Sequence, residues 1–228
     1  MDSSAHAYPI LGLYAGRARP MPNDGRPTAI FKQLIQGPVR ITALGLADDE
    51  QADLRVHGGP DKAVHHFPLD NHRRLARQFP ELAAQFVSGG IGENISTEGQ
   101  DESSACIGDV YALGSARVQL AQPRSPCWKI DAKFGHEGIT RFIAEQGMAG
   151  WYYRVLEPGQ AEVGDALRLL ERNAEALSLA EFWRTVHAHR PEREELLRIA
   201  ATPGLSKGWE KRLRERAEWL SGNASAMT

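Results

Sequence analysis

The sequence is poor in cysteine, has no long apolar run and shows no excess of either charge, and each shortage excludes a class of protein. Two cysteines among 228 residues are too few for a secreted fold held together by disulfide bonds. The longest apolar runs fall far short of the roughly 20 residues that cross a bilayer. Lys and Arg number 27 against 29 Asp and Glu, so no overall positive field draws the chain to nucleic acid or an anionic membrane.

The remaining composition is ordinary for a folded protein. Hydrophobic residues make up 42% and charged residues 25% of the chain, and its length lies between one large domain and two small ones. Residues 1–6 contain no basic segment followed by an apolar one, so we expect no secretory leader and a cytoplasmic location. Neither a membrane nor nucleic acid is therefore expected as a partner.

Residues 1–175 predict a mainly β domain with some helix. A Gly-Asp pair, typical of turns, precedes an alternating segment at Gly108 and again at Gly164, and we interpret both as entries to strands of a barrel or sandwich. A turn at Gly114 joins the first of these strands to one that ends at Pro123. Strand length and β-branched or aromatic content predict four further strands: Pro9–Ala15, Thr28–Gln33, Val39–Thr42 and Val64–Phe67.

Residues 176–228 predict a small domain of three amphipathic helices. Ser178 and Glu181 have the spacing of a capping box, which marks the start of the first helix. Pro191 suits the first turn of the second helix, and the third follows Ser206. Because basic and acidic residues are mixed along these helices, we expect a packing or interaction module rather than a DNA-binding one.

The segment around Cys127 carries the strongest chemical signal. Ser125 is a good N-cap and Pro126 suits the first helical position, so a short helix is predicted over residues 126–134, before Gly135. Cys127 then lies in the first turn, where unpaired amides and the helix dipole favour a thiolate.

Charge near the two cysteines separates their expected roles. Arg124 and Lys129 are close to Cys127 in sequence and favour a nucleophilic or metal-binding thiolate over a buried, apolar cysteine. Cys106 follows an acidic and polar loop that opposes a thiolate. We therefore assign a role to Cys127 alone.

One further segment has the composition of a ligand-binding loop. Its Gly58-Gly59 pair lets backbone amides approach a ligand closely, and His57 and Asp61 supply polar groups around the turn. A glycine-rich stretch over residues 89–96 is a weaker candidate, in which the amide of Asn94 suits the edge of a heterocycle. Neither stretch has the glycine spacing of a nucleotide-binding motif.

A zinc site is disfavoured. In a strand, His65 and His66 point to opposite faces, so at most one of them could join Cys127 at a common site. The usual zinc-binding spacings are also missing from the sequence.

Three motifs in this order carry a family resemblance: residues 57–63 (His-Gly-Gly-Pro-Asp-Lys-Ala), residues 92–94 (Gly-Glu-Asn) and residues 125–127 (Ser-Pro-Cys). The chain resembles the MOSC domain family, named for the C-terminal domain of molybdenum cofactor sulfurases, and most of all its stand-alone YiiM-like branch. In that branch a three-helix domain follows the MOSC domain, so the resemblance extends over nearly the whole chain.

The resemblance implies a β-barrel core that binds a molybdopterin-type molybdenum cofactor, with Cys127 as the protein ligand to molybdenum. A thiolate is a soft ligand suited to such a metal, and the cofactor's phosphate requires cations. Cys127, Asp61 and His57 are the implied catalytic residues. The implied cofactor-binding residues are Lys32, Arg55, His57, Asp61, Asn94, Arg124, Ser125 and Cys127.

Similar family members, notably the mitochondrial amidoxime reducing component, reduce N-hydroxylated compounds. By that resemblance we expect detoxifying reduction of N-hydroxylated bases such as hydroxylaminopurines, with electrons from a partner reductase and protons relayed by Asp61 or His57. Two alternatives stay open: a cofactor carrier without catalysis, and a sulfur transferase with a persulfide on Cys127. The physiological substrate and the formation of a homodimer also stay open.

Overall fold

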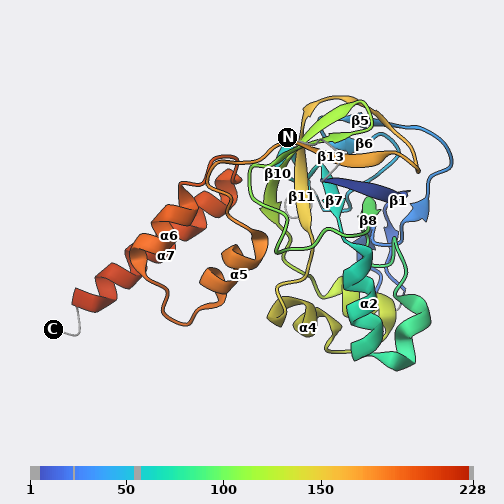
Figure 1. Ribbon diagram of the computed structural model, residues 1–228. Helices are drawn as coiled ribbons and strands as arrows, with labels where there is room; N and C mark the ends of the chain where they lie inside the picture. The colour runs from blue at the N-terminus through green and yellow to red at the C-terminus, as the bar shows by residue number, and fades with distance from the viewer. Residues whose placement is uncertain (1–5, 23, 54–57, 226–228) are drawn as a thin grey trace.

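The computed structural model describes residues 6–22, 24–53 and 58–225, with side chains as far as Ser221. Within these residues, seven strands form a closed ring, because β1 pairs with β13 and completes a barrel (Figure 1). The expected barrel is thereby confirmed. In ring order the strands are β13 (Ala166–Glu171), β9 (Val110–Leu113), β10 (Ala116–Pro123), β11 (Trp151–Glu157), β7 (Val64–His66), β8 (Ile95–Thr97) and β1 (Ala7–Ala15).

The ring is antiparallel except for one pair, since β7 and β8 run parallel. Three groups of short strands lie outside it. They are β4 (Gln33–Leu34) beside β1, the sheet of β5 (Val39–Thr42), β6 (Gly45–Leu46) and β12 (Gly159–Ala161), and the pair β2 (Arg19–Pro20) and β3 (Pro27–Thr28).

Local signals predicted several of these elements correctly. β5 has the predicted bounds, and the turn at Gly114 joins β9 to β10, which ends at Pro123 as expected. The strand predicted over residues 28–33 is wrong. Thr28 Oγ1 accepts a hydrogen bond from the Ile30 amide at 3.2 Å, and the Ile30 carbonyl accepts one from the Lys32 amide at 3.1 Å. Local turn hydrogen bonds therefore replace pairing with a neighbouring strand.

Helices cover one end and one side of the barrel. Figure 1 shows α2 and α4 at the lower end and α5, α6 and α7 projecting to one side. No helix in the described part of the chain is both long and apolar enough to cross a membrane. The 3₁₀ helices are η1 (Pro60–Lys62) and η2 (Pro80–Gln85), and the α-helices are α2 (Leu69–Gln78), α3 (Lys129–Phe134), α4 (Ile139–Glu145), α5 (Leu179–His187), α6 (Arg193–Ala200) and α7 (Lys207–Ser225).

The three predicted terminal helices are present. Ser178 is the N-cap of α5, and its hydroxyl accepts the Glu181 amide at 3.1 Å, as the capping-box spacing predicts. α6 begins at Arg193, two residues after the predicted proline, and α7 follows Ser206.

Apolar side chains form two clusters that hold these elements together. The larger cluster fills the barrel and continues into the terminal helices, because Leu120 of β10 belongs to the same cluster as Phe182 and Trp209. The smaller cluster lies beneath α2, α3 and α4 and includes Phe67 and Ile143. The terminal helices therefore pack on the barrel wall through a shared core, and the division at residue 175 stays a prediction.

Candidate functional site

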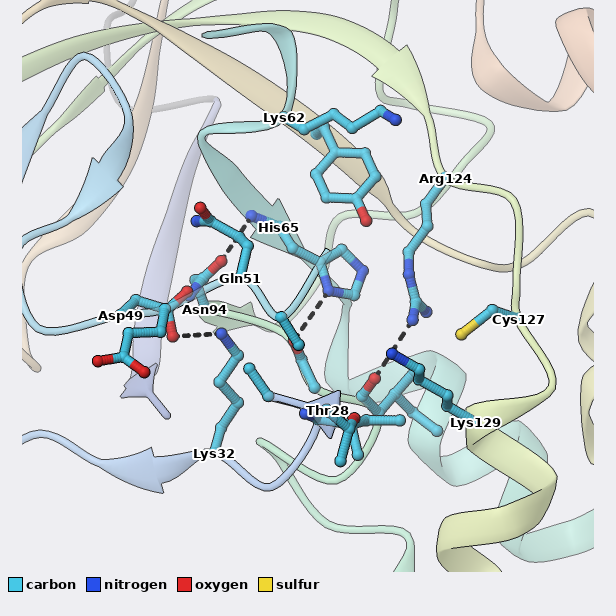
Figure 2. A pocket seen from close by; sticks show the side chains of 17 residues that line it. Thr28, Lys32, Asp49, Gln51, Lys62, His65, Asn94, Arg124, Cys127 and Lys129 are labelled. Atoms are coloured by element: carbon cyan, nitrogen blue, oxygen red, sulfur yellow. Dashed lines mark hydrogen bonds and ion pairs between the residues drawn. The ribbon is translucent and has the colours of Figure 1, made fainter. Parts of the chain in front are cut away.

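A pocket opens beside the end of β10, where segments far apart in the sequence meet (Figure 2). Its walls come from the loops after β3 and β6, from η1, β7 and β11, from the loop before β8, and from the segment between β10 and the start of α3. The polar side chains that line it are Thr28, Lys32, Asp49, Glu50, Gln51, Lys62, His65, Asn94, Arg124, Cys127, Lys129 and Tyr152.

Cys127 lies on the pocket wall between β10 and α3 and is half-buried. The predicted helix begins three residues late, because Trp128 is the N-cap of α3 and the first helical residue is Lys129. Cys127 thus precedes the helix, and its carbonyl accepts the Ile130 amide at 3.0 Å and the Thr140 hydroxyl at 3.2 Å. The expected first-turn effect of the helix dipole on this thiol is therefore wrong, and nearby side-chain charge is what remains.

Arg124 supplies that charge from inside the wall. Its backbone amide donates to the Gly150 carbonyl at 3.0 Å, and the residue is only 5% exposed. One guanidinium nitrogen, Nη2, reaches the Ile91 carbonyl at 3.5 Å, while Nη1 has no hydrogen-bond partner among the described residues. A buried cation with unused donors is costly unless an anion pairs with it, so the pocket has the chemistry of an anion-binding site.

Lys32 also reaches the pocket, but its charge is already paired. Its ammonium contacts the Asp49 carboxylate, and both side chains are almost fully buried. Burial lowers the pKa of Lys32 from its usual value, and the Asp49 charge opposes that change. Asp49 was not predicted as a site residue; it also accepts the Gly16 amide at 2.8 Å.

The Asn94 amide is fully used by the protein itself. Its Nδ2 donates to Asp49 Oδ2 at 2.8 Å and to the Tyr14 carbonyl at 3.1 Å, and its Oδ1 accepts the His65 amide at 3.0 Å. Asn94 therefore lines the pocket as a brace between β1, β7 and Asp49, with no amide donor left for a ligand.

His65 and His66 point to opposite faces of β7, as strand alternation predicts. His65 lines the pocket with Nδ1 at 3.3 Å from the Gly92 carbonyl, whereas His66 contacts Tyr153 and Thr97 inside the barrel. Burial, reinforced by the Arg124 charge, holds the pKa of His65 well below its usual value. The His65 imidazole is therefore neutral at pH 7 and offers hydrogen bonds rather than charge.

Glu93 organises the glycine-rich loop behind these residues. Its carboxylate accepts the amides of Gly89 and Ile91 at 2.5 and 3.0 Å, and lies 2.7 Å from Nε2 of His72. Burial alone would raise its pKa, but His72 and the amide donors lower the pKa to about 2. An ionised Glu93 thus fixes the loop that carries Asn94.

Two predicted site residues lie elsewhere. Asp61 is paired with Arg154, whose Nε and Nη2 both approach Oδ1 at 2.8 Å, and it does not line the pocket. Its neighbour Lys62 does line the pocket. Ser125 faces an adjacent groove instead and makes no capping bond to α3.

Arg55 and His57, both predicted to bind the cofactor, lie outside the described residues. The structure therefore brings together Lys32, Asn94, Arg124 and Cys127 from the predicted set. It adds Asp49 and Tyr152, for which the sequence held no signal: Asp49 lies within a short acidic run, Asp48 to Glu50, and Tyr152 is an ordinary strand residue. In the described ranges, no group of three or more His, Cys, Asp or Glu side chains is arranged to hold a metal ion.

Comparisons with known proteins show the family and the fold of the chain. A family model described as the MOSC domain matches residues 53–168. Protein YiiM of Escherichia coli (strain K12) is 38% identical in sequence over 94% of this chain and 94% of its own length. The crystal structure of YiiM from Escherichia coli superposes on this chain with a TM-score of 0.77. That superposition covers 95% of this chain and 94% of the crystallised chain, at 32% identity. A protein named Reductase from Gibberella moniliformis is 34% identical over 78% of this chain, which covers 32% of that protein.

Proposed function

The chain belongs to the MOSC domain family, and from that premise we propose that it binds a molybdenum cofactor at Cys127 and reduces N-hydroxylated compounds to amines. One observation carries the proposal: the buried Arg124 guanidinium, with an unused donor, lines the same pocket as the accessible Cys127 thiol. A thiolate beside an unsatisfied cation suits a ligand that is both a soft metal and a phosphate ester.

The residues present fit such a cofactor. Cys127 would hold the molybdenum, and Arg124, Lys62 and Lys129 would pair with the cofactor's phosphate. Lys129 Nζ donates to the Pro27 carbonyl at 2.9 Å, which leaves an ammonium other donors to offer. A single protein thiolate is sufficient because this class of cofactor brings its own sulfur ligands.

The bound cofactor supplies two-electron oxygen-transfer chemistry. In the overall reaction, a hydroxylamine R–NHOH takes up two electrons and two protons, the N–O bond breaks, and R–NH₂ and water leave. Lys32, held on Asp49 at the pocket wall, replaces Asp61 as the proposed proton carrier. His65 and Tyr152 would offer neutral hydrogen-bonding groups to a heterocyclic substrate.

The electrons would come from a partner reductase. The fungal relative is named Reductase, which supports reductive chemistry in a protein that contains a region similar to this chain. We also propose N-hydroxylated purines as the substrate class, because two neutral ring side chains that can form hydrogen bonds, His65 and Tyr152, line the pocket together, with ring centroids 5.2 Å apart.

Metal analysis and a reduction assay on the purified protein test the proposal together. We expect about one molybdenum per chain and reduction of 6-hydroxylaminopurine with a chemically reduced viologen as electron donor. Cys127→Ser should lose about 100-fold or more of the activity together with the metal, because the ligand is gone. Cys106→Ser is the matched control, since that cysteine is buried away from the pocket and should leave both unchanged.

Other outcomes would identify the alternatives. One molybdenum per chain without turnover would indicate a cofactor carrier. No molybdenum, together with a sulfane sulfur on Cys127 detected by mass spectrometry, would indicate a sulfur transferase. Full activity in Cys127→Ser would contradict the assignment of the metal ligand.

A further inference from the structure

A buried carboxylate outside the pocket is tied to Arg124 through one glycine. Glu102 is 5% exposed, and its Oε1 accepts the Asn71 side-chain amide at 2.8 Å and the Gly150 backbone amide at 3.1 Å. Gly150 in turn accepts the backbone amide of Arg124 at 3.0 Å through its carbonyl. The two hydrogen bonds of Gly150 therefore join Glu102 to the residue that supplies the pocket's buried cation.

Gly150 occupies a position that only glycine can fill. Its φ is +73°, and a Cβ at this site would lie 2.1 Å from the His66 carbonyl oxygen. Only glycine fits this combination of left-handed backbone and close approach. With β7 on one side, the orientation of the peptide at Gly150 depends on the acceptor that receives its N–H, which is Glu102.

The loop that carries Glu102 also forms hydrogen bonds with the N-terminal end of α5. The Glu102 carbonyl accepts the Ala180 amide at 2.8 Å, and the Ala105 carbonyl accepts the Leu179 amide at 3.0 Å. The first turn of α5 is thus attached to the same short loop whose side chain holds Gly150. The connection from α5 to Arg124 runs entirely through buried or hydrogen-bonded groups.

We propose that Glu102 is a positioning residue: through Gly150 it sets the place of the Arg124 guanidinium beside Cys127, and it ties that place to the attachment of α5. The inference rests on the proposed function only for the importance of Arg124. Removing the carboxylate would leave the Gly150 N–H and an Asn71 N–H without their buried acceptor, so the backbone on both sides of the Gly150 Cα would rearrange as the N–H finds another acceptor. The Gly150 carbonyl, and with it Arg124, would then move.

The rates at which two alkylating reagents modify the Cys127 thiol report the charge next to it. Iodoacetate is anionic and iodoacetamide is neutral, so the ratio of their rates at Cys127 reports a nearby cation, while general loosening of the fold changes both rates alike. The full-length protein would be made in cells that lack the molybdenum cofactor, and modification of Cys127 would be followed by peptide mass spectrometry. Arg124→Met would calibrate the loss of the cation.

We expect Arg124→Met to lower the iodoacetate-to-iodoacetamide ratio about fivefold, the size expected for one nearby charge in a screened setting. Glu102→Ala should lower the ratio by a similar factor although it removes no positive charge. Glu102→Gln should stay within about twofold of the wild type, because its Oε1 still accepts both donors. Asp109→Asn is the matched control, since that carboxylate is fully buried but lies in a separate network with Tyr111 and Asn173.

Glu102→Asp keeps the experiment decisive if Glu102→Ala does not fold. It retains the charge but withdraws the acceptor by one methylene, and an intermediate ratio is expected. A wild-type ratio in Glu102→Ala, or in Glu102→Asp where Glu102→Ala does not fold, would overturn the proposal. An unchanged ratio in Arg124→Met would also overturn it, because Arg124 would then not act at Cys127. No step uses molybdenum, substrate or reductant, so a failed reductase assay and a failed positioning role give different results.

Discussion

The stability of the protein should depend on pH through Glu102, and the replacement Glu102→Gln isolates that dependence. Burial raises the pKa of Glu102 from 4.5 to about 7, although its own backbone amide, Asn71 and Gly150 oppose the change. Below pH 4.5 the carboxyl is protonated in both the folded and the unfolded chain. As the pH rises toward 7, the unfolded chain loses this proton first, so the free energy of unfolding falls with pH and levels off above the folded-state pKa.

The size of the effect follows from the pKa shift. At about 1.4 kcal/mol per pKa unit, the wild type should lose about 2–3 kcal/mol relative to Glu102→Gln between pH 5 and pH 8. Urea unfolding at several pH values, followed by tryptophan fluorescence, gives the free energies whose difference is needed. The other charged or titratable groups that line the cleft beside Glu102 are Arg74, Asp101, Glu145, Arg184 and His187. Their titration is common to both proteins, so it cancels in the difference between the two unfolding free energies. A difference that stays constant across this range would refute the reasoning, because Glu102 would then already be ionised at pH 5.

Two further replacements test the supports of the pocket. Glu93→Gln should lower the free energy of unfolding by about 3 kcal/mol and reduce the molybdenum content, because the ionised carboxylate holds the amides of Gly89 and Ile91. Urea unfolding and metal analysis check this prediction. Wild-type values of both the unfolding free energy and the molybdenum content would contradict the role of Glu93 as a support of the loop. Asn94→Asp should destabilise the protein by about 2–3 kcal/mol, because it places a second carboxylate opposite Asp49. Adding Asp49→Asn should restore part of the lost stability in urea unfolding. If the free-energy changes of the two replacements are strictly additive, the contact between residues 94 and 49 is contradicted.

Local chemistry alone located several parts of this protein. The turn at Gly114, the strand Val39–Thr42 and the cap at Ser178 depend on residues within a few positions of one another, and all three are present in the structure. The choice of Cys127 also came from neighbouring residues, Arg124 among them. Its expected place in a helix was wrong because α3 begins only at Lys129, next to Ile130 of the smaller core cluster, and not at Pro126.

Contacts between residues that are distant in the sequence determine the rest of the site. Asp61 is paired with Arg154, 93 residues further along, while Asp49 lies against Lys32 and Asn94, and neither pairing has a sequence signature. Such contacts exist only once the barrel closes and places β11, β7, β8 and β1 side by side in that order. The sequence by itself therefore indicated the reactive side chains, Cys127 above all, and local features such as the turn at Gly114. Tertiary structure alone decided which of the described charges are neutralised and that the buried Arg124 guanidinium keeps a donor without a partner among them, because burial and pairing depend on the whole fold.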